Sequence, residues 1–326
     1  MKKRYIALGL LGVAIGALYL GNASWLATPQ GEAPYFIAHR GVHQTFDPVR
    51  VGRDDCTAVL IDPPRHTLIE NTLPSIEAAF AAGASRVEID IHPTTDGEFA
   101  VFHDWTLDCR TQGSGPVRAQ SMDMLGTLDA GYGYTADGGE TFPLRGLGIG
   151  AIPTLAEVFD AFPARDFLIN IKSNDPQEAE ALVAYIEARA LPVGHMIILS
   201  APRPDARLAA LRPDIRRMSR ATVRRCARDY LAWGWSGHVP QSCHDTVVVL
   251  PANYAGFAWG WPTRLENRMA AVGTEVWVMG DLDRSSMNST GIDTAAARDA
   301  LDARFRGGIS TNRIERVGPN AWQPEN

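Results

Sequence analysis

Short apolar runs that alternate with helical patterns are the feature that most constrains the fold of this chain. Each run is β-branched or apolar and ends in polar residues, as buried strands do. The runs cover residues 35–38, 87–91, 99–102, 167–171, 196–199, 215–218, 247–250, 275–279 and 308–310. Apolar residues at helical spacing lie between most of these runs. The alternation predicts an α/β fold with a parallel sheet.

The expected ends of two helices can be placed from the sequence. Leu73, Ile76 and Phe80 form an apolar stripe that we expect to begin behind a Thr72 cap and to end before Gly83. A second stripe is expected to end near residues 191–192, and its members are Ala179, Leu182, Val183 and Ile186.

A hairpin signal decides how the strands are counted. The runs 87–91 and 99–102 are joined by a short segment that contains Asp96-Gly97, a typical hairpin turn. A connection this short cannot make a parallel crossover. Counted once, the hairpin leaves eight β units, as a TIM (β/α)8 barrel requires. We therefore predict such a barrel over residues 35–318, with a β-hairpin excursion after its second strand.

Two segments are longer than a minimal barrel needs. Residues 42–69 separate the first strand from the first helix, and residues 111–153 are glycine-rich and polar. Both follow strand ends on the face where such barrels place their active sites. We expect them to be long loops that shape or cover the site.

The N-terminus, residues 1–26, is a targeting segment. Lys2, Lys3 and Arg4 precede an uncharged run over residues 5–20, which residues 21–26 can lengthen. One interpretation is a signal peptide cleaved near residues 21–23, and the other is an uncleaved membrane anchor. Either places the body, behind a linker at 27–34, in the cell envelope outside the cytoplasmic membrane. Residues 319–326 are expected to be a tail.

Four cysteines fit this location. They form no CxxC pair, so a zinc site is not expected. In an oxidising compartment two disulfides are expected, with three pairings possible. Proximity in sequence favours Cys226–Cys243, which leaves Cys56–Cys109. Buried free thiols are the alternative interpretation.

The charge balance restricts the partners. The formal net charge is -6 and no basic block is present, so nucleic acid is not an expected partner. An anionic substrate would need local positive charge or a metal ion, because the overall field does not attract it.

Proton carriers end two of the predicted strands. His39-Arg40-Gly41 follows the first strand, where the histidine can move a proton, the arginine can hold a phosphate through two hydrogen bonds and the glycine lets backbone approach a ligand. His103-Asp104 ends the return arm of the hairpin and supplies a second proton carrier.

Glu88 and Asp90 alternate on one strand and therefore share a face. Two carboxylates inside a barrel repel each other unless a cation lies between them, and oxygen ligands suit Ca²⁺ or Mg²⁺. His92 continues the same face and is expected to point to the site. The alternative is a pair of solvated carboxylates at a sheet edge.

Further polar residues follow the same pattern. Asn170 and Lys172 alternate on a later strand, where Asn170 offers an amide oxygen to a metal and Lys172 a charge to a phosphate. Glu70 lies at a helix start beside Asn71 and Thr72. Those two residues also suit a helix cap, which is the structural alternative for that motif.

These motifs, taken in order, resemble the glycerophosphodiester phosphodiesterase family, within the superfamily of phosphatidylinositol-phosphodiesterase-like TIM barrels. The motifs that carry the resemblance are His39-Arg40-Gly41, Glu70-Asn71-Thr72, Glu88-Ile89-Asp90, Asp96-Gly97, Val101-Phe102-His103-Asp104 and Thr106-Leu107-Asp108. The resemblance is strong over residues 36–111 and diffuse as far as about residue 314.

The resemblance implies roles for individual residues. It implies that His39 and His103 act as acid and base, and that Arg40 and Lys172 contact the phosphate. It implies a divalent cation, Ca²⁺ or Mg²⁺, whose expected ligands are Glu88, Asp90, Glu70 and Asn170. Glu70 is also expected to support the first histidine and the phosphate site.

The chain departs from the family pattern in three places. The family has a glutamate where this chain has Asn170, so weaker metal binding is expected. The loop at 42–69 is larger than the family minimum, and Cys109 interrupts a Leu-Asp-Arg-Thr run.

The expected function is metal-dependent hydrolysis of glycerophosphodiesters to glycerol phosphate and an alcohol. A phospholipase acting on intact lipids is the alternative on the same fold, which the membrane segment and Trp259-Gly260-Trp261 favour. A non-catalytic binding protein of the envelope is the third candidate, and Asn170 is its main support. An uncleaved anchor would associate each of these with the membrane through residues 5–26.

Overall fold

The computed structural model describes residues 2–47, 51, 55–285 and 288–323. The chain divides into two compact units. Unit 1 comprises Met1–Tyr35, Arg220–Ile292 and Ala296–Ser310, and unit 2 comprises Phe36–Ser219, Asp293–Ala295 and Thr311–Asn326.

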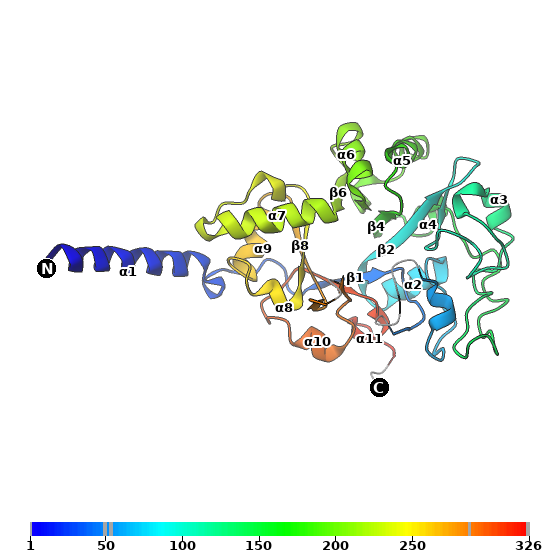
Figure 1. Ribbon diagram of the computed structural model, residues 1–326, viewed down its shortest axis with the longest axis horizontal. Coiled ribbons are helices and arrows are strands. Elements are labelled where there is room, and N and C mark those ends of the chain that lie inside the picture. The colour runs from blue at the N-terminus through cyan, green and yellow to red at the C-terminus, as the bar shows by residue number, and fades with distance from the viewer. Residues whose placement is uncertain (1, 48–50, 52–54, 286–287, 324–326) are drawn as a thin grey trace. The chain divides into compact units, whose positions relative to one another are not determined.

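Unit 2 contains most of the predicted strands (Figure 1). Its parallel strands pair in the order β6-β5-β4-β2-β1, and β3 pairs with β2. The strands are β1 (Tyr35–His39), β2 (Ala84–Pro93), β3 (Phe99–Val101), β4 (Asp166–Ile171), β5 (Met196–Ser200) and β6 (Arg216–Ser219). The helices are α2 (Leu73–Ala81), α3 (Met122–Leu125), α4 (Leu155–Ala161), α5 (Pro176–Ala188), α6 (Pro202–Leu211) and α11 (Ile314–Val317).

Unit 1 contains three further parallel strands, which pair in the order β11-β8-β7. These are β7 (Val247–Pro251), β8 (Glu275–Met279) and β11 (Gly308–Thr311), with a small antiparallel pair, β9 (Leu282–Asp283) and β10 (Asn288–Ser289). The helices are α1 (Lys2–Asn22), α7 (Arg220–Trp233), α8 (Ala252–Ala255), α9 (Thr263–Ala270) and α10 (Ala295–Asp299), and the short 3₁₀ turns include η1 (Ser24–Leu26) and η6 (Gly234–Ser236).

The strand count confirms the predicted fold class. Five parallel strands in unit 2 and three in unit 1 make the eight of a TIM-barrel-like α/β fold. The predicted hairpin excursion is also confirmed, because β3 runs antiparallel to β2, with Ile91 opposite Val101 and Pro93 opposite Phe99.

Both faces of β2 are buried, as a strand inside a barrel requires. Val87, Ile89 and Ile91 are fully buried on one face, and Glu88 and Asp90 are only 5% and 1% exposed on the other. The solvated-edge interpretation of this carboxylate pair is therefore wrong.

Both helices whose ends were predicted are present, as α2 and α5. α2 buries Ile76 and Phe80 as expected, and Thr72 occupies its N-cap position. The Thr72 hydroxyl does not cap the helix, however, because it donates to the carbonyl of Ile69. α5 ends at Ala188, short of the predicted end near residues 191–192.

Both predicted disulfides are present, so the free-thiol interpretation is wrong. Cys226 pairs with Cys243 in unit 1, and Cys56 pairs with Cys109 in unit 2. The Cys56–Cys109 bond joins the first long segment, residues 42–69, to the residues just before the second one, residues 111–153.

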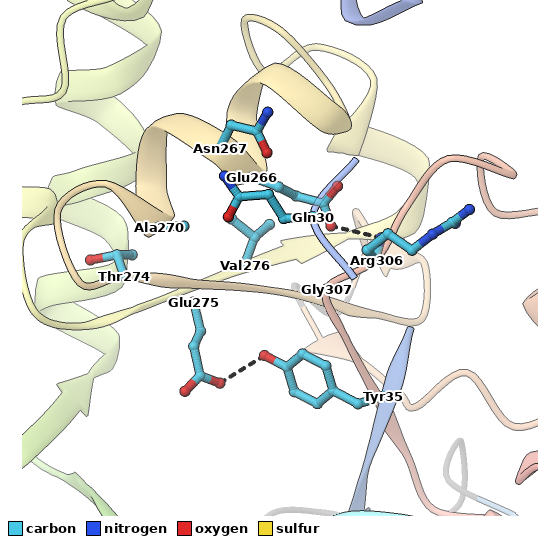
Figure 2. Close-up of a pocket in the computed structure, with 10 residues that line it drawn as sticks. All are labelled: Gln30, Tyr35, Glu266, Asn267, Ala270, Thr274, Glu275, Val276, Arg306 and Gly307. Atoms are coloured by element: carbon cyan, nitrogen blue, oxygen red, sulfur yellow. Dashed lines mark hydrogen bonds between the residues drawn. The ribbon is translucent and has the colours of Figure 1, made fainter. Parts of the chain in front are cut away.

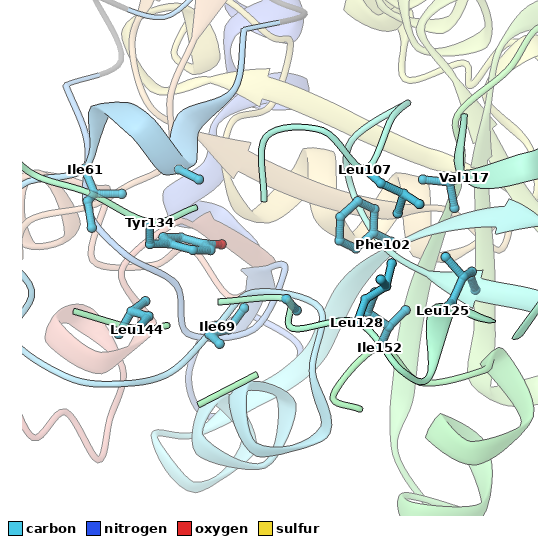
Figure 3. Packing of buried hydrophobic residues seen from close by; sticks show 13 residues of the cluster. Ile61, Ile69, Phe102, Leu107, Val117, Leu125, Leu128, Tyr134, Leu144 and Ile152 are labelled. Carbon is cyan, nitrogen blue, oxygen red and sulfur yellow. The ribbon is translucent and has the colours of Figure 1, made fainter. Parts of the chain in front are cut away.

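The two long segments share an apolar cluster with residues 100–107, and we call it the satellite core (Figure 3). Its members are Ala58, Ile61, Ile69, Ala100, Phe102, Leu107, Val117, Leu125, Leu128, Ala130, Tyr134, Leu144 and Ile152. Cys56 and Cys109 pack against its side. The described parts of both segments are thus anchored by packing; residues 48–50 and 52–54 lie outside the described chain.

A small pocket in unit 1 is lined by a half-buried carboxyl group (Figure 2). Gln30, Glu266 and Arg306 line it, and the Glu266 carboxylate accepts a hydrogen bond of 2.8 Å from the backbone N–H of Arg306. Burial raises the pKa of Glu266 to about 7. The carboxyl is therefore favoured in its neutral form when the protein is folded.

Replacing Glu266 with Gln is expected to flatten the pH dependence of stability. The folded pKa lies above the ordinary value of 4.5, so the stabilising contribution is complete below pH 4.5 and is lost as the pH rises through 7. The wild type should lose about 1 to 2 kcal/mol of unfolding free energy between about pH 5 and 8, allowing for solvent screening. Urea unfolding across this pH range measures the loss. Glu32→Gln, at an exposed position, is the control and should keep the wild-type dependence.

Candidate active site

The predicted site residues in unit 2 lie at the carboxyl ends of adjacent parallel strands. His39 on β1 is opposite Glu88 on β2, and Asp90 is opposite Asn170 on β4. The carboxyl ends of barrel strands are where catalytic groups gather. The strand register therefore brings these four residues together.

A tight backbone turn follows β1. Arg40 and Gly41 both have positive φ, 56° and 77°. The N–H of Arg40 donates to the backbone carbonyl of Glu88 (3.0 Å), and its own carbonyl accepts from the N–H of Asn71 (3.1 Å). A Cβ on Gly41 would lie 2.3 Å from the Ser75 hydroxyl oxygen, so only glycine fits.

Asp90 is held by two cations. Its Oδ2 lies 3.3 Å from Arg40 Nε, and its Oδ1 lies 3.3 Å from Lys172 Nζ. Burial acts to raise the pKa of Asp90, but His103, Lys172 and Arg40 together hold it well below its ordinary value. Asp90 is therefore an anion at neutral pH.

Two amide side chains complete the surroundings of Asp90. Asn170 Nδ2 donates to Asp90 Oδ1 (2.8 Å), and Asn71 Nδ2 donates to Asp90 Oδ2 (3.3 Å). The backbone N–H of Asp90 donates to Asn71 Oδ1 (3.1 Å). The Asn71 side chain therefore binds Asp90 of β2 instead of capping α2. The Asn71 backbone has a positive φ of 60° in this arrangement.

Glu88 is the carboxylate that lacks a close cationic partner among the described residues. It accepts a 3.3 Å bond from the Arg40 N–H, and His39 Nε2 lies 3.8 Å away. Burial and the Asp90 charge raise its pKa to about 8. Four carboxylates face three cations here: Glu70, Glu88, Asp90 and Asp104 against Arg40, Lys172 and Arg110. With no cation close to it, Glu88 is the carboxylate favoured in its protonated, neutral form.

His39 is oriented by a polar chain that the sequence did not reveal. Its Nδ1 lies 2.7 Å from Asn312 Oδ1. The backbone N–H and the Nδ2 of Asn312 donate to the two oxygens of Asp293, at 2.7 and 2.8 Å. Because a carboxylate only accepts, Asn312 must turn its oxygen to His39. The proton is then on Nδ1, and Nε2 is free to accept another.

The second histidine has a similar arrangement. His103 Nδ1 lies 2.6 Å from Asp104 Oδ1, and Arg110 Nε donates to Asp104 Oδ2 (2.8 Å). The carboxylate holds the Nδ1 proton, so Nε2 faces outward here too. Burial and Arg40 lower the pKa of both histidines, that of His39 to about 3.

Arg110 connects the site to the satellite core. Its side chain is fully buried, and it pairs with Asp104 and with Glu70 Oε2 (3.1 Å). It also donates to Thr57 Oγ1 (2.6 Å) and to the Tyr134 hydroxyl, which belong to the two long segments. Burial acts to raise the pKa of Glu70, but Arg110 and Arg40 hold it at about 2.

His92 does not join the other candidates. It is fully buried, with its ring 5.4 Å from Trp105, and its Nε2 lies 3.4 Å from the carbonyl of His103. Burial lowers its pKa to about 4. Its contact with the second histidine is therefore with the backbone of that residue.

Some of these residues could be found in the sequence and some could not. Asn312 directly follows β11, so its place at a strand end was a usable signal. Arg110 follows Cys109 in the interrupted motif. Asp293 lies in a loop before α10 with no local pattern to identify it.

The donor set fits a hard divalent cation at Glu88. Among the described residues this buried carboxylate has no close positive partner, and the amide of Asn170 offers a further oxygen. Asp90 lies on the same face, with each of its oxygens 3.3 Å from a cation. Both oxygens of Glu70 already face guanidinium groups. Elsewhere in the described residues, one acid–cysteine group has ligand spacing, Cys56, Asp104 and Cys109, but its cysteines form a disulfide and are not ligands.

A family model matches this part of the chain. The model of the glycerophosphoryl diester phosphodiesterase family covers residues 39–195. This region begins at His39 and includes all the predicted site residues, whereas Asp293 and Asn312 lie beyond it.

Similar proteins carry the same description. A glycerophosphodiester phosphodiesterase of Bacillus subtilis (strain 168) is 34% identical over 192 residues, which is 55% of this chain and 58% of that protein. The chain spans about 39%, 56% and 58% of the length of three curated relatives that it matches.

Solved structures confirm the fold. The glycerophosphoryl diester phosphodiesterase domain of an uncharacterized Mycobacterium tuberculosis protein has a TM-score of 0.60 at 18% identity, over 87% of this chain and 97% of that one. An Oleispira antarctica phosphodiesterase in complex with the product sn-glycerol-3-phosphate has a TM-score of 0.54 at 19% identity, over 87% and 95%.

Replacing Gly41 with Ala is expected to destabilise the fold by about 2 to 4 kcal/mol, because positive φ and a steric clash add together. Gly97→Ala is the matched control, since its φ is 82° but no atom lies within 4 Å of a Cβ there. That variant should lose only about 1 kcal/mol. Denaturant unfolding of both compares them, and equal losses would contradict the steric argument.

Proposed function

We propose, because the chain belongs to the glycerophosphodiester phosphodiesterase family, that it is a phosphoric diester hydrolase that cleaves glycerophosphodiesters into glycerol phosphate and an alcohol. The observation that carries the proposal is the matched pair of imidazoles. His39 and His103 are each held through Nδ1, and each leaves Nε2 free beside the buried Glu88 and Asp90. Phosphodiester cleavage needs one proton acceptor and one donor, and this arrangement supplies both.

The two histidines differ in the group that holds them. His39 contacts a neutral amide and its pKa is lowered to about 3, so it starts neutral and suits the role of base. His103 contacts the Asp104 carboxylate, which partly offsets the lowering of the His103 pKa by burial and Arg40, so His103 is proposed to carry the proton for the role of acid.

The reaction then balances as follows. The nucleophile, either water or a hydroxyl of the glycerol moiety, gives its proton to His39 Nε2 as its oxygen bonds to phosphorus. The bond from phosphorus to the leaving oxygen breaks, and His103 Nε2–H protonates the alkoxide. A cyclic product of the second route would need a further water to open it.

Arg40 and Lys172 are proposed to hold the phosphate. Both lie at Asp90 and are largely buried, so they are fixed before the substrate binds. The fork of the Arg40 guanidinium suits two phosphoryl oxygens, whereas Lys172 acts as a point charge.

We propose Glu88, Asp90 and Asn170 as the main holders of a divalent cation, Ca²⁺ or Mg²⁺, with Glu70 supporting Arg40 at its edge. When bound, such a cation supplies positive charge to the phosphoryl oxygens. Glu88 is the residue that a cation would change most, because burial and the Asp90 charge raise its pKa to about 8 and a further positive charge would favour its ionised form.

The substrate class follows from the family and from one similar structure. The Oleispira antarctica phosphodiesterase holds sn-glycerol-3-phosphate as its product. We propose the same product here. A phospholipase activity or a binding role without catalysis would show as cleavage of intact phosphatidylcholine, or as no turnover of glycerophosphocholine and bis-p-nitrophenyl phosphate.

His39→Ala and His103→Ala are each expected to lower kcat on glycerophosphocholine by about 10² to 10⁴ without unfolding the protein, because each removes a proton carrier. Glycerol phosphate release measures the effect, and the denaturation midpoint reports on the fold. Near-normal turnover in either variant would contradict the proposal.

Two further variants make this experiment specific. His195 binds Asp166 just before β5, at the opposite end of that strand from the site, so His195→Ala should keep full activity. Asp293→Ala should lower kcat by about 10 to 100-fold with little change in KM, because Asn312 is then free to turn its amide.

EDTA is expected to abolish turnover, and Ca²⁺ or Mg²⁺ to restore it. Asn170→Glu should lower the metal concentration needed for half-saturation by about tenfold, because it adds a charged oxygen ligand. Titration calorimetry measures the affinity apart from activity. The control is Asn174→Glu, at an exposed position shortly after the same strand, which should leave the affinity unchanged. An unchanged affinity in Asn170→Glu would place the metal elsewhere.

A further inference from the structure

Helix α1 has the length and composition of a membrane span. Its 21 residues extend over about 31 Å at about 1.5 Å per residue, close to the roughly 30 Å of a bilayer's hydrocarbon layer. The stretch Arg4–Asn22 passes a test for membrane spans by length and composition, and none of it is buried. A cleaved signal peptide would share these properties, so the helix alone does not distinguish the two.

The end of α1 is bound to the body of unit 1 by an arginine of α9. Arg268 donates to the carbonyl of Gly21 (3.0 Å) and to Asn22 Oδ1 (3.0 Å). The same guanidinium donates to the Tyr230 hydroxyl (3.1 Å) and to the carbonyl of Gly234 (3.1 Å). Arg268 thus ties the helix end to α7 and to the turn that follows it.

A second arginine of α9 strengthens this connection. Arg264 Nε donates to the carbonyl of Ala23 (2.9 Å), and its NH2 donates to that of Leu20 (3.4 Å). The N–H of Thr263 donates to the Ser24 hydroxyl oxygen (2.8 Å). Ala23 is buried as a result.

The segment beyond the helix follows the same surface. Asn267 Nδ2 donates to the carbonyl of Thr28 (3.0 Å), and Asn22 Nδ2 donates to the carbonyl of Trp235 (2.8 Å). Residues 20–28 therefore have fixed partners on α9 and η6, and Figure 1 shows α1 leaving unit 1 beside the labelled α7 and α9.

Cleavage near residues 21–23 would remove most of these acceptors. If the cut falls after Ala23, Arg264 loses the carbonyls of Leu20 and Ala23, and Arg268 loses two of the four partners described above. Groups that are held this closely in the folded unit are part of its structure. The network is complete only when α1 stays attached.

Exposed apolar side chains surround the same point. Trp25 and Leu26 follow α1 in η1, Trp233 ends α7, and Trp235 lies in η6 against Asn22. They are between 46% and 58% exposed. We call these four residues the anchor collar. Tryptophan at the end of a membrane span is typical of the headgroup region of a bilayer.

We propose that α1 is retained as a transmembrane anchor and that the anchor collar lies in the headgroup layer of the membrane it crosses. The N-terminal end of the anchor is then in the cytoplasm, because the sequence is basic there, at Lys2, Lys3 and Arg4. The body is then outside, where the disulfides Cys56–Cys109 and Cys226–Cys243 are stable. The proposal does not depend on the proposed activity.

The first experiment tests retention. The full chain is expressed in a bacterium, and its membranes are washed with alkaline carbonate. The protein should stay in the membrane with an intact mass of about 35.4 kDa. A soluble envelope form that begins near Ser24 would overturn the proposal.

The second experiment tests the connection to α9 in the intact protein. Arg264→Ala and Arg268→Ala should each speed amide hydrogen exchange over residues 20–28 in detergent by about tenfold or more, because an opening free energy of 1.4 kcal/mol or more is lost. Arg304→Ala, at an exposed position of the same unit, is the control. Unchanged exchange in both α9 variants would show that the helix end is not held.

The third experiment tests the collar. In nanodiscs that contain phosphatidylcholine labelled with a doxyl group near the headgroup, tryptophan fluorescence should be quenched. Trp25→Phe and Trp235→Phe should each reduce the quenched fraction, whereas Trp277→Phe, at a buried position in the same unit, should not. Equal quenching in all three variants would overturn the proposed contact with lipid.

Discussion

The burial of carboxylates on β2 is the constraint on which the site depends. Asp90 and Glu88 lie on the inward face of the strand, where an unbalanced charge costs several kcal/mol. Arg40 and Lys172 must therefore reach Asp90, and Arg40 does so from a turn with positive φ. The strained turn, the glycine after it and the cations are consequences of placing negative charge in the barrel. Among the described residues Glu88 has no close cationic partner, and its burial beside Asp90 raises its pKa.

The same charge balance explains why the two long segments form a core instead of free loops. Arg110 neutralises Asp104 and Glu70, but a guanidinium has more donors than two carboxylates use. Thr57 and Tyr134 accept the remainder, and each comes from one of those segments. The satellite core thus supplies the polar partners that keep a buried arginine in place. Its disulfide holds together the segments that provide them.

The sequence predicts what local patterns encode. The strands, the Asp-Gly hairpin and the shared face of Glu88 and Asp90 follow from period-two alternation and turn chemistry, and all three are present in the structure. The partner of His39 could not be found in this way, because Asn312 is 273 residues away and becomes its neighbour only through the fold. Thr72 shows the opposite failure. Threonine suits a helix cap, but the Thr72 hydroxyl donates to the carbonyl of Ile69 instead.

A membrane anchor does not by itself make the substrate a membrane lipid. The groups proposed to react are only partly recessed: the side chain of His39 is 35% exposed and that of His103 is 13% exposed, while Asp90 beside them is 1% exposed. A diester in a bilayer would have to be lifted far enough for its phosphorus to reach Nε2 of both histidines, at the cost of exposing its acyl chains to water. A glycerophosphodiester that has already lost its acyl chains meets no such cost. The partial burial of the site therefore favours a small soluble diester as the proposed substrate, and a retained anchor would determine where the protein works more than what it cleaves.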